Sequence, residues 1–203
     1  AHEIILSHFV SQRSNVLVGT QMLAKGLDLP KVTLVGIVLA DVGLNLPDPF
    51  AAERVFQVLT QVAGRAGRSA LGGKVILQTF QPEHYAIQAA AGHDYIGFYN
   101  RELAERQKLG YPPFRRLVRL EYRHLDTQTA ESNTRNMVEV LQARLTKAGR
   151  VETDVLGPVP CFYAKQNDLY RWQIILRGPD PASILPTRFP DGWRVEIDPP
   201  DLL

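Results

Sequence analysis

The sequence predicts an α/β fold in two parts, a parallel sheet with helices packed on it and then a small α+β domain. Apolar strand-like segments and amphipathic helices alternate over residues 1–82, the order expected of a parallel sheet because its strands are joined by helical crossovers. A long helical stretch then ends at the pair Pro112 and Pro113, which stops a helix and marks a boundary. Beyond it, polar and apolar residues alternate over several segments, as they do in strands.

Each element of the first part is predicted from its own pattern of apolar residues. Helices are predicted where apolar residues recur every three or four positions, and strands where short apolar runs end at loop residues. The run from Val32 to Asp41 is almost continuously apolar, which predicts a strand covered on both faces. In chain order the predicted elements are a helix at 3–10, a strand at 16–18, a helical turn at 22–25, a strand at 32–41, a helix at 50–62 and a strand at 74–79.

The second part follows a predicted helix over 83–109. Between residues 118 and 123, apolar residues alternate with charged ones, which predicts a strand with one face on the core and the other in solvent. An apolar stripe then predicts a helix that closes at Gly149. The remaining predictions are strands at 170–176 and 193–197 and a second helix near 182–185, in a layout of strand, helix, strand, strand, helix and strand.

Composition limits the classes of function. With 203 residues and a net charge of +2, the chain is that of an ordinary globular protein, and this charge does not by itself indicate a nucleic-acid partner. The sequence has no apolar run long enough to span a bilayer and no signal-peptide pattern, so we expect no membrane partner and a cytoplasmic location. Cys161 is the single cysteine, which excludes an internal disulfide, and the histidines lack metal-ligand spacing, so no metal ligands are predicted.

The most informative run is Gln61-Val-Ala-Gly-Arg-Ala-Gly-Arg68. It places Arg65 and Arg68 three residues apart, and Gly64 and Gly67 have no side chain that would keep these arginines away from a ligand. Arginine has a permanent charge and a rigid fork of donors, which suit the charge that develops on a transferring phosphoryl group. Considered alone, the run also fits a solvent-exposed loop.

Two motifs resemble those of the second RecA-like lobe of superfamily 2 helicases. Gly19-Thr-Gln-Met-Leu-Ala-Lys-Gly-Leu-Asp-Leu-Pro30 is similar to motif V of that superfamily, and Gln61 to Arg68 is similar to motif VI. More closely, the chain resembles the PriA-type helicases over nearly its whole length. The further segments that carry this resemblance are Ala51-Ala-Glu-Arg54, Val75 to Thr79, Leu103-Ala-Glu-Arg106, Tyr111-Pro-Pro-Phe114, Leu156-Gly-Pro-Val-Pro160 and Tyr170-Arg-Trp-Gln173.

The resemblance implies a domain organisation and an origin. Residues 1–82 are expected to form the RecA-like lobe with motifs V and VI, residues 83–113 a helical connector and residues 114–203 an α+β C-terminal domain. The chain begins with Ala1 rather than methionine. We therefore expect it to be a C-terminal fragment of a PriA-type helicase.

The resemblance also implies contacts with ATP. Arg65 and Arg68 match the motif VI arginines that reach the γ-phosphate, with Arg68 in the position of the arginine finger, and Gln61 matches the glutamine near the same phosphate. These three are the implied catalytic residues. The implied nucleotide-binding residues are Gly26, Gly64 and Asp28, the last of which matches the acidic residue expected at the ribose.

Nucleic-acid contacts are implied at two places. Thr20, Gln21 and Lys25 belong to the motif V loop, which is expected to pass between ATP and DNA. Lys165 and Arg171 in the C-terminal domain are candidate phosphate contacts, and a solvated strand face is the alternative interpretation of both.

As a whole, the resemblance implies an ATP-dependent DNA helicase of 3′ to 5′ polarity that recognises stalled or branched forks and initiates primosome assembly. Its implied partners are branched and single-stranded DNA, single-stranded DNA-binding protein and primosome proteins. ATP and Mg²⁺ are expected to be bound mainly by a first lobe, and zinc by a cysteine-rich insertion that has no counterpart in this chain.

The motifs that this sequence lacks limit the expectation. There is no Gly-x-x-x-x-Gly-Lys-[Ser/Thr] loop and no Asp-Glu pair after an apolar strand, so we expect this chain alone not to hydrolyse ATP. The alternative function is a non-hydrolysing, DNA-binding primosome scaffold that has lost the ATPase motifs.

Overall fold

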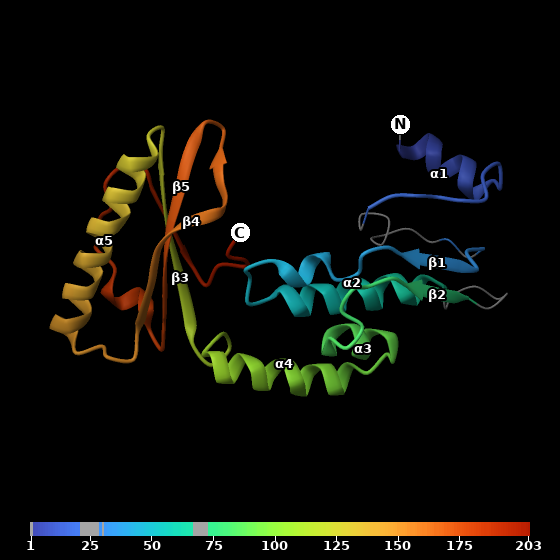
Figure 1. Cartoon of the computed structure of the whole chain (residues 1–203), viewed down its shortest axis with the longest axis horizontal. Coiled ribbons are helices and arrows are strands. Elements are labelled where there is room, and N and C mark those ends of the chain that lie inside the picture. The colour runs from blue at the N-terminus through green and yellow to red at the C-terminus, as the bar shows by residue number, and fades with distance from the viewer. Residues whose placement is uncertain (1, 21–28, 30, 67–72) are drawn as a thin grey trace. The chain divides into compact units, whose positions relative to one another are not determined.

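A computed structural model describes residues 2–20, 29, 31–66 and 73–203, without the side chains of 2, 65 and 66. Packing divides the chain into unit 1, residues 1–45 with 51–99, and unit 2, residues 46–50 with 100–203 (Figure 1). The structure confirms the predicted mixed α/β fold class. Packing within the chain does not test whether the ranges 1–82, 83–113 and 114–203 are separate domains, so that division stays a prediction. No helix in the described ranges has the length and apolar content needed to cross a membrane.

Unit 1 is organised around a two-stranded parallel sheet. Strand β1 (Leu34–Ile37) pairs in parallel with β2 (Lys74–Leu77), and between them in the chain lies helix α2 (Ala51–Ala66), preceded by the short 3-10 helix η2 (Val42–Asn45). The first helix, α1 (His2–Val10), also forms where it was predicted. The parallel strand pair and the helix between its strands are therefore confirmed.

The core of unit 1 lies along one face of α2. Val55, Phe56 and Leu59 recur at helical spacing and are buried, because this face packs on helix α3 (Tyr85–Ala91) and on Phe98. The rings of Phe56 and Phe98 stack with their centroids 4.0 Å apart and their planes 1° from parallel. This packing fixes the rotation of α2 about its axis and leaves its opposite face exposed.

Of the strand predictions for unit 1, one was wrong and another was too long. Residues 16–18 are not a strand, and the side chains of Val16 and Val18 are 72% and 87% exposed. A strand requires hydrogen bonds from a neighbour, and the described parallel sheet of this unit holds only β1 and β2. For the same reason β1 is shorter than 32–41 and is not covered on both faces, with Leu34 exposed. The helical turn predicted at 22–25 lies outside the described residues.

The helix predicted over 83–109 is two helices, α3 and α4 (Tyr95–Leu109). Gly92 caps the end of α3, and His93 has a φ of 53°, which no continuous helix allows. The Asp94 carboxylate accepts a hydrogen bond of 2.8 Å from the Gly97 N–H, and so begins α4 in the way that an N-terminal cap does. Periodicity alone continued through this break because apolar residues lie on both sides of it.

Unit 2 contains a four-stranded antiparallel sheet in the order β4-β5-β3-β6, with α5 along one face (Figure 1). The predicted order of strand, helix, strand, strand, helix and strand is confirmed, except that the second helix is the 3-10 turn η3. Strand β4 had no predicted range. The elements are β3 (Arg116–His124), α5 (Thr127–Ala148), β4 (Asp154–Gln166), β5 (Leu169–Gly178), η3 (Pro181–Ile184) and β6 (Trp193–Ile197).

The main core of unit 2 lies between α5 and the sheet. The helix is capped at both ends: the Asp126 carboxylate accepts from the Thr129 N–H at 2.7 Å, and Gly149 adopts the left-handed conformation. Its buried stripe, which includes Leu141, packs on residues of β3 and β5 such as Leu120 and Ile174. This is the apolar face that the alternation in β3 and β5 predicted.

The other face of the sheet differs from the prediction. Arg119 and Glu121 on β3 were predicted to face solvent, but they are 4% and 2% exposed. Arg171 on β5, which was a candidate phosphate contact, is also buried. Burial of charged side chains requires that they be paired, and their pairing forms the second site described below.

Candidate functional site

The motif VI segment begins on the exposed face of α2. Gln61 and Gly64 are both exposed there, on the last turns of a helix whose other face carries the buried Leu59. The described part of the motif thus has Gln61 and Gly64 at the surface of α2.

Gly64 has open space beside it. A Cβ atom built on Gly64 meets no atom within 4 Å, so nothing in the described residues requires a glycine at this point of the helix. Glycine in a helix interior costs about 1 kcal/mol relative to alanine. If the glycine has a purpose, it is to admit a ligand or another part of the protein to the backbone of α2.

Most of the predicted nucleotide and DNA contacts lie outside the described residues. These are Gln21, Lys25, Gly26, Asp28, Arg68 and the side chain of Arg65. Thr20 is described and lies exposed at the end of the extended segment that follows α1. All of these assignments stay predictions.

Asp41 ties the ends of the two parallel strands together. It follows β1, is buried, and accepts a hydrogen bond of 3.2 Å from the backbone N–H of Phe80, which follows β2. Burial would raise the pKa of Asp41, but hydrogen bonds from backbone N–H groups and from the Thr79 side chain outweigh it and lower the pKa. Asp41 is therefore a charged structural link between the two loops that follow the strands.

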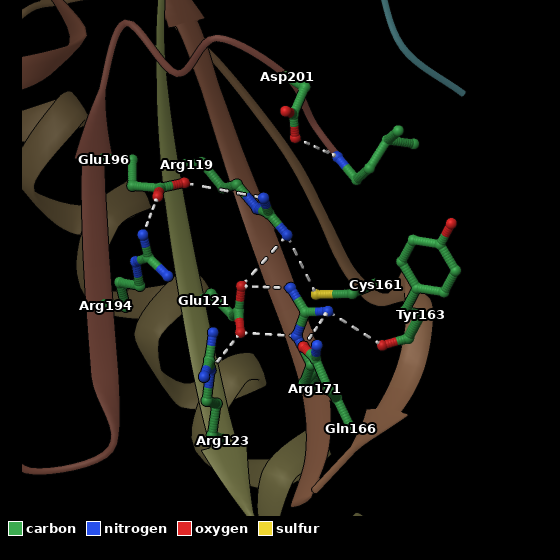
Figure 2. Close-up of polar contacts among 11 residues, drawn as sticks. Arg119, Glu121, Arg123, Cys161, Tyr163, Gln166, Arg171, Arg194, Glu196 and Asp201 are labelled. Carbon is green, nitrogen blue, oxygen red and sulfur yellow. Dashed lines mark hydrogen bonds and ion pairs between the residues drawn. The ribbon is translucent and has the colours of Figure 1, made fainter. Parts of the chain in front are cut away.

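In unit 2, a second candidate site centres on Glu121 (Figure 2). Its carboxylate accepts two hydrogen bonds from Arg171, from Nε to Oε1 at 2.8 Å and from Nη2 to Oε2 at 2.9 Å. Arg119 approaches the same carboxylate with Nη2 3.2 Å from Oε2, and Arg123 donates to Oε1. Three guanidinium groups thus surround one buried carboxylate, and we call these four residues the arginine cluster.

The members of the arginine cluster shift each other's pKa values. Burial raises the pKa of Glu121, but hydrogen bonds and charge from Arg171 and Arg123 dominate and lower it from 4.5 to about 2. The Arg171 pKa is raised in turn, chiefly by its hydrogen bonds to Glu121. Among the described residues, the buried Nε of Arg119 has no hydrogen-bond partner. The cluster therefore keeps its carboxylate ionised and carries more positive than negative charge.

The two C-terminal residues predicted to contact phosphate have different environments. Each nitrogen of the Arg171 guanidinium donates within the protein, including Nη1 to the carbonyl oxygen of Tyr163 at 3.4 Å and to Gln166 Oε1 at 3.2 Å. Such a buried, occupied fork does not favour Arg171 as a phosphate contact. Lys165 is exposed, with Nζ 3.6 Å from an Asp168 carboxylate oxygen and 5.2 Å from the centroid of the Tyr170 ring. Lys165 remains open to a ligand.

Sequence reasoning missed Arg119 and Glu121 as members of a site. Alternation correctly put them on the face opposite α5, but it could not show that Arg171 of the neighbouring strand lies beside them. The register pairs Glu121 with Gln173 and Arg123 with Arg171, so the signal was two alternating strands that both carry charge on the same face. Within the described ranges, no group of three or more His, Cys, Asp or Glu residues could hold a metal ion.

Comparison with protein families gives two matches. Residues 1–70 match the family described as helicase conserved C-terminal domain, and residues 107–200 match the family described as primosomal protein N C-terminal domain. The first match contains most of unit 1, including α2 with the exposed Gln61 and Gly64. The second contains the whole four-stranded sheet and the arginine cluster.

Curated relatives match across both units, and each is named replication restart protein PriA. The protein from Bacillus subtilis is 42% identical over 177 residues, which is 87% of this chain and 22% of the relative. The protein from Synechocystis is 42% identical over 91% of this chain and 22% of the relative, and that from Treponema pallidum is 44% identical over 86% and 26%. The chain thus spans about a quarter of the length of these relatives.

Proposed function

The chain belongs to the family of the replication restart protein PriA, and we propose that it supplies the second motor lobe and the C-terminal domain of an ATP-dependent DNA helicase. In this proposal the whole protein recognises stalled or branched forks, unwinds DNA with 3′ to 5′ polarity and begins primosome assembly. Its partners are branched and single-stranded DNA, single-stranded DNA-binding protein and primosome proteins. The proposed location is the cytoplasm.

One observation supports the motor assignment most directly. The apolar stripe of α2 is buried, while Gln61 and Gly64 are exposed on the last turns of the helix, with open space beside Gly64. The face of α2 that carries Gln61 and Gly64 is not used for packing, so it can be approached by a ligand. Motif VI is proposed to act on the γ-phosphate of ATP.

The proposed chemistry is electrostatic. As a phosphoryl group transfers, negative charge spreads over its oxygens, and an arginine that meets this charge lowers the barrier without taking part in bond changes. We assign this role to Arg68, with Arg65 beside it, and assign to Gln61 the orientation of groups at the same phosphate. Gly64 and Gly26 allow the backbone to approach the nucleotide, and Asp28 accepts from the ribose hydroxyls.

The segment from Thr20 to Asp28 couples the two ligands in this proposal. Thr20, Gln21 and Lys25 contact the DNA backbone, while Gly26 and Asp28 meet the nucleotide. A loop that touches both ligands changes its DNA contacts when the nucleotide changes, which is the coupling that a translocating motor requires. The exposed position of Thr20 after α1 is consistent with such a loop.

Mg²⁺ and zinc are assigned to other parts of the protein. The charge neutralisation that Mg²⁺ supplies to ATP is proposed to depend mainly on a first motor lobe, since this sequence has no phosphate-binding loop. The described residues do not fit zinc, because they offer no group of three ligands. No step that we assign to this chain involves zinc.

The motor assignment is tested by Arg68→Ala in the intact protein. We expect DNA-stimulated ATP hydrolysis to fall by about a thousandfold or more, the effect of losing an arginine finger, while affinity for forked DNA stays near that of the wild type. The matched control is Arg188→Ala, which removes an exposed arginine of unit 2 and should leave hydrolysis unchanged. Undiminished hydrolysis in Arg68→Ala would remove the finger assignment.

The second candidate function is a DNA-binding primosome scaffold that does not hydrolyse ATP. It is favoured by the lack of a phosphate-binding loop and of an acidic pair in this sequence. In that case Gln61 and Gly64 would be exposed without a catalytic purpose. Hydrolysis by the wild-type protein separates the two functions.

A further inference from the structure

Strand β4 leaves the sheet over residues 161–164. Its pairing with β5, which already shifts register once between Leu156 and Val159, stops after Pro160, which lies opposite Trp172, and resumes at Lys165, which lies opposite Tyr170. Four residues of β4 therefore span a gap that one residue of β5 spans. This interruption forms a bulged segment at the edge of the sheet, and we call residues 161–164 the β4 bulge.

The arginine cluster contacts the β4 bulge at two residues. Cys161 is buried, and its sulfur lies 3.7 Å from Nη2 of Arg119. Arg171 donates from Nη1 to the carbonyl oxygen of Tyr163, so two arginines of the cluster reach two residues of the bulge (Figure 2). Because Glu121 holds Arg171 in turn, the bulge is attached to a fixed and buried support.

The bulge presents two adjacent aromatic rings to solvent. Phe162 and Tyr163 are 47% and 56% exposed, although neighbouring residues of a regular edge strand point to opposite faces, one of them usually buried. Their ring centroids lie 5.0 Å apart with an interplanar angle of 79°. An exposed pair of rings is unfavourable in water, and a rigid support for such a pair indicates that it meets a partner.

Lys165 and the arginine cluster place basic side chains at the β4 bulge. Arg123 is partly exposed at the edge of the arginine cluster, and Lys165 follows the bulge directly. Glu121 is enclosed by three guanidinium groups, and the acidic group beside Lys165 is Asp168, which is almost fully exposed. Exposed aromatic rings among cations match a strand of nucleic acid, whose bases stack and whose phosphates carry negative charge. They match an apolar protein partner less well.

We propose that Phe162 and Tyr163 form a base-stacking site for single-stranded DNA, with Lys165 placed against the backbone phosphate. The proposal extends the proposed function, because it gives the C-terminal domain a named contact with the unpaired strand of a fork. The arginine cluster then has a structural role, which is to support the bulge. This assignment also explains why the fork of Arg171 is used within the protein.

The test is the affinity of the intact protein for a labelled oligothymidine, measured by fluorescence anisotropy without nucleotide. Phe162→Ala with Tyr163→Ala should weaken binding by roughly tenfold or more, since base stacking on one ring contributes about 1 to 3 kcal/mol. Phe162→Tyr and Tyr163→Phe keep the rings and should bind as the wild type does. Leu125→Ala, which shortens another exposed apolar side chain of unit 2, is the control for surface truncation.

A strand of abasic sugar-phosphate separates stacking from charge. On that strand the double alanine variant should bind as tightly as the wild type, because there are no bases to stack, whereas Lys165→Ala should weaken both strands. If the double variant and the wild type bind oligothymidine with equal affinity, the stacking site is wrong while the proposed function stands. The rings would then meet a protein partner. If the wild type does not bind oligothymidine at all, both the stacking site and the proposed DNA function fail.

Discussion

Arg171 and Glu121 are joined by two parallel hydrogen bonds, from Nε to Oε1 at 2.8 Å and from Nη2 to Oε2 at 2.9 Å, on a sheet face where both side chains are buried. This two-point contact connects β5 to β3, and Arg171 also reaches the backbone of the β4 bulge through Tyr163. One pair of residues thus couples three strands. We expect the pair to contribute to the acid stability of unit 2 and to hold the backbone of the β4 bulge.

The lowered pKa of Glu121 predicts a loss of stability in acid. The pKa falls from an ordinary value of 4.5 to about 2 in the folded protein, so the stabilisation is complete above pH 4.5 and is lost as the pH falls toward 2. The free energy of unfolding should decrease over that window by about 3 kcal/mol from this group alone. Urea denaturation followed by circular dichroism at a series of pH values measures it.

Two variants identify the group responsible. Glu121→Gln cannot titrate, so its stability should change less between pH 4.5 and 2 than that of the wild type, although it should be lower at pH 7. Glu139→Gln alters an exposed glutamate of α5 and should keep the wild-type pH dependence. An unchanged slope in Glu121→Gln would show that Glu121 is not held ionised by the cluster.

Removal of Arg171 should reduce stability far more than removal of Lys165. Arg171→Ala leaves the Glu121 carboxylate buried with one strong partner fewer, and breaking a buried ion pair in this way typically costs about 3 to 5 kcal/mol. Lys165→Ala removes an exposed ammonium, so it should leave the free energy of unfolding within about 0.5 kcal/mol and reduce the salt dependence of DNA binding by about one ion. Thermal denaturation and a salt titration distinguish the two residues; equal effects on both readouts contradict their different assignments.

Gly64→Ala separates folding from catalysis at the motif VI helix. A methyl group at this position meets no atom of the chain within 4 Å, so α2 should become more stable by up to about 1 kcal/mol. In the intact protein the same methyl group should lower DNA-stimulated ATP hydrolysis, because it narrows the approach to α2. A variant that is more stable and fully active would show that no ligand or other lobe meets Gly64.

Two glycines of unit 2 should respond differently to alanine. Gly149 has a φ of 64° with no atom within 4 Å of a built Cβ, so Gly149→Ala carries only the cost of the left-handed conformation, about 1 kcal/mol. Gly157 has a φ of 110°, and a Cβ there would lie 2.8 Å from the carbonyl oxygen of Gln173. Gly157→Ala should therefore destabilise the protein at least twice as much. Comparable denaturation midpoints for the two variants would contradict the described path of β4.

Local patterns predicted the elements that pack on a core within this chain. The stripe of α5 and the alternation of β3 and β5 gave the correct faces, since burial of apolar side chains determines both. The strand predicted at Val16 to Val18 failed because strand formation depends on a neighbour, which a run of apolar residues does not reveal. The helix over 83–109 failed at Gly92 and His93, where a change of backbone conformation outweighs the periodicity around it.

The pairing of charged side chains between neighbouring strands could not be predicted from the sequence. Charged residues that alternate with apolar ones normally face solvent, and this expectation was wrong for Arg119 and Glu121 because Arg171 neutralises the carboxylate from the next strand. The β4 bulge could not be predicted either, because Pro158 and Pro160 interrupt the alternating pattern of a strand. The motif VI residues were identified by their resemblance to a helicase motif, and their positions beyond Ala66 lie outside the described residues.

ATP hydrolysis by the intact wild-type protein tests the proposal that this chain supplies the second lobe of a working motor. The rate should be measured with and without forked DNA, with Arg68→Ala as the matched inactive variant. We expect hydrolysis that rises when forked DNA is added and that disappears in Arg68→Ala. No hydrolysis by the wild type above the level of that variant, with DNA binding intact, would contradict the motor and leave the primosome scaffold.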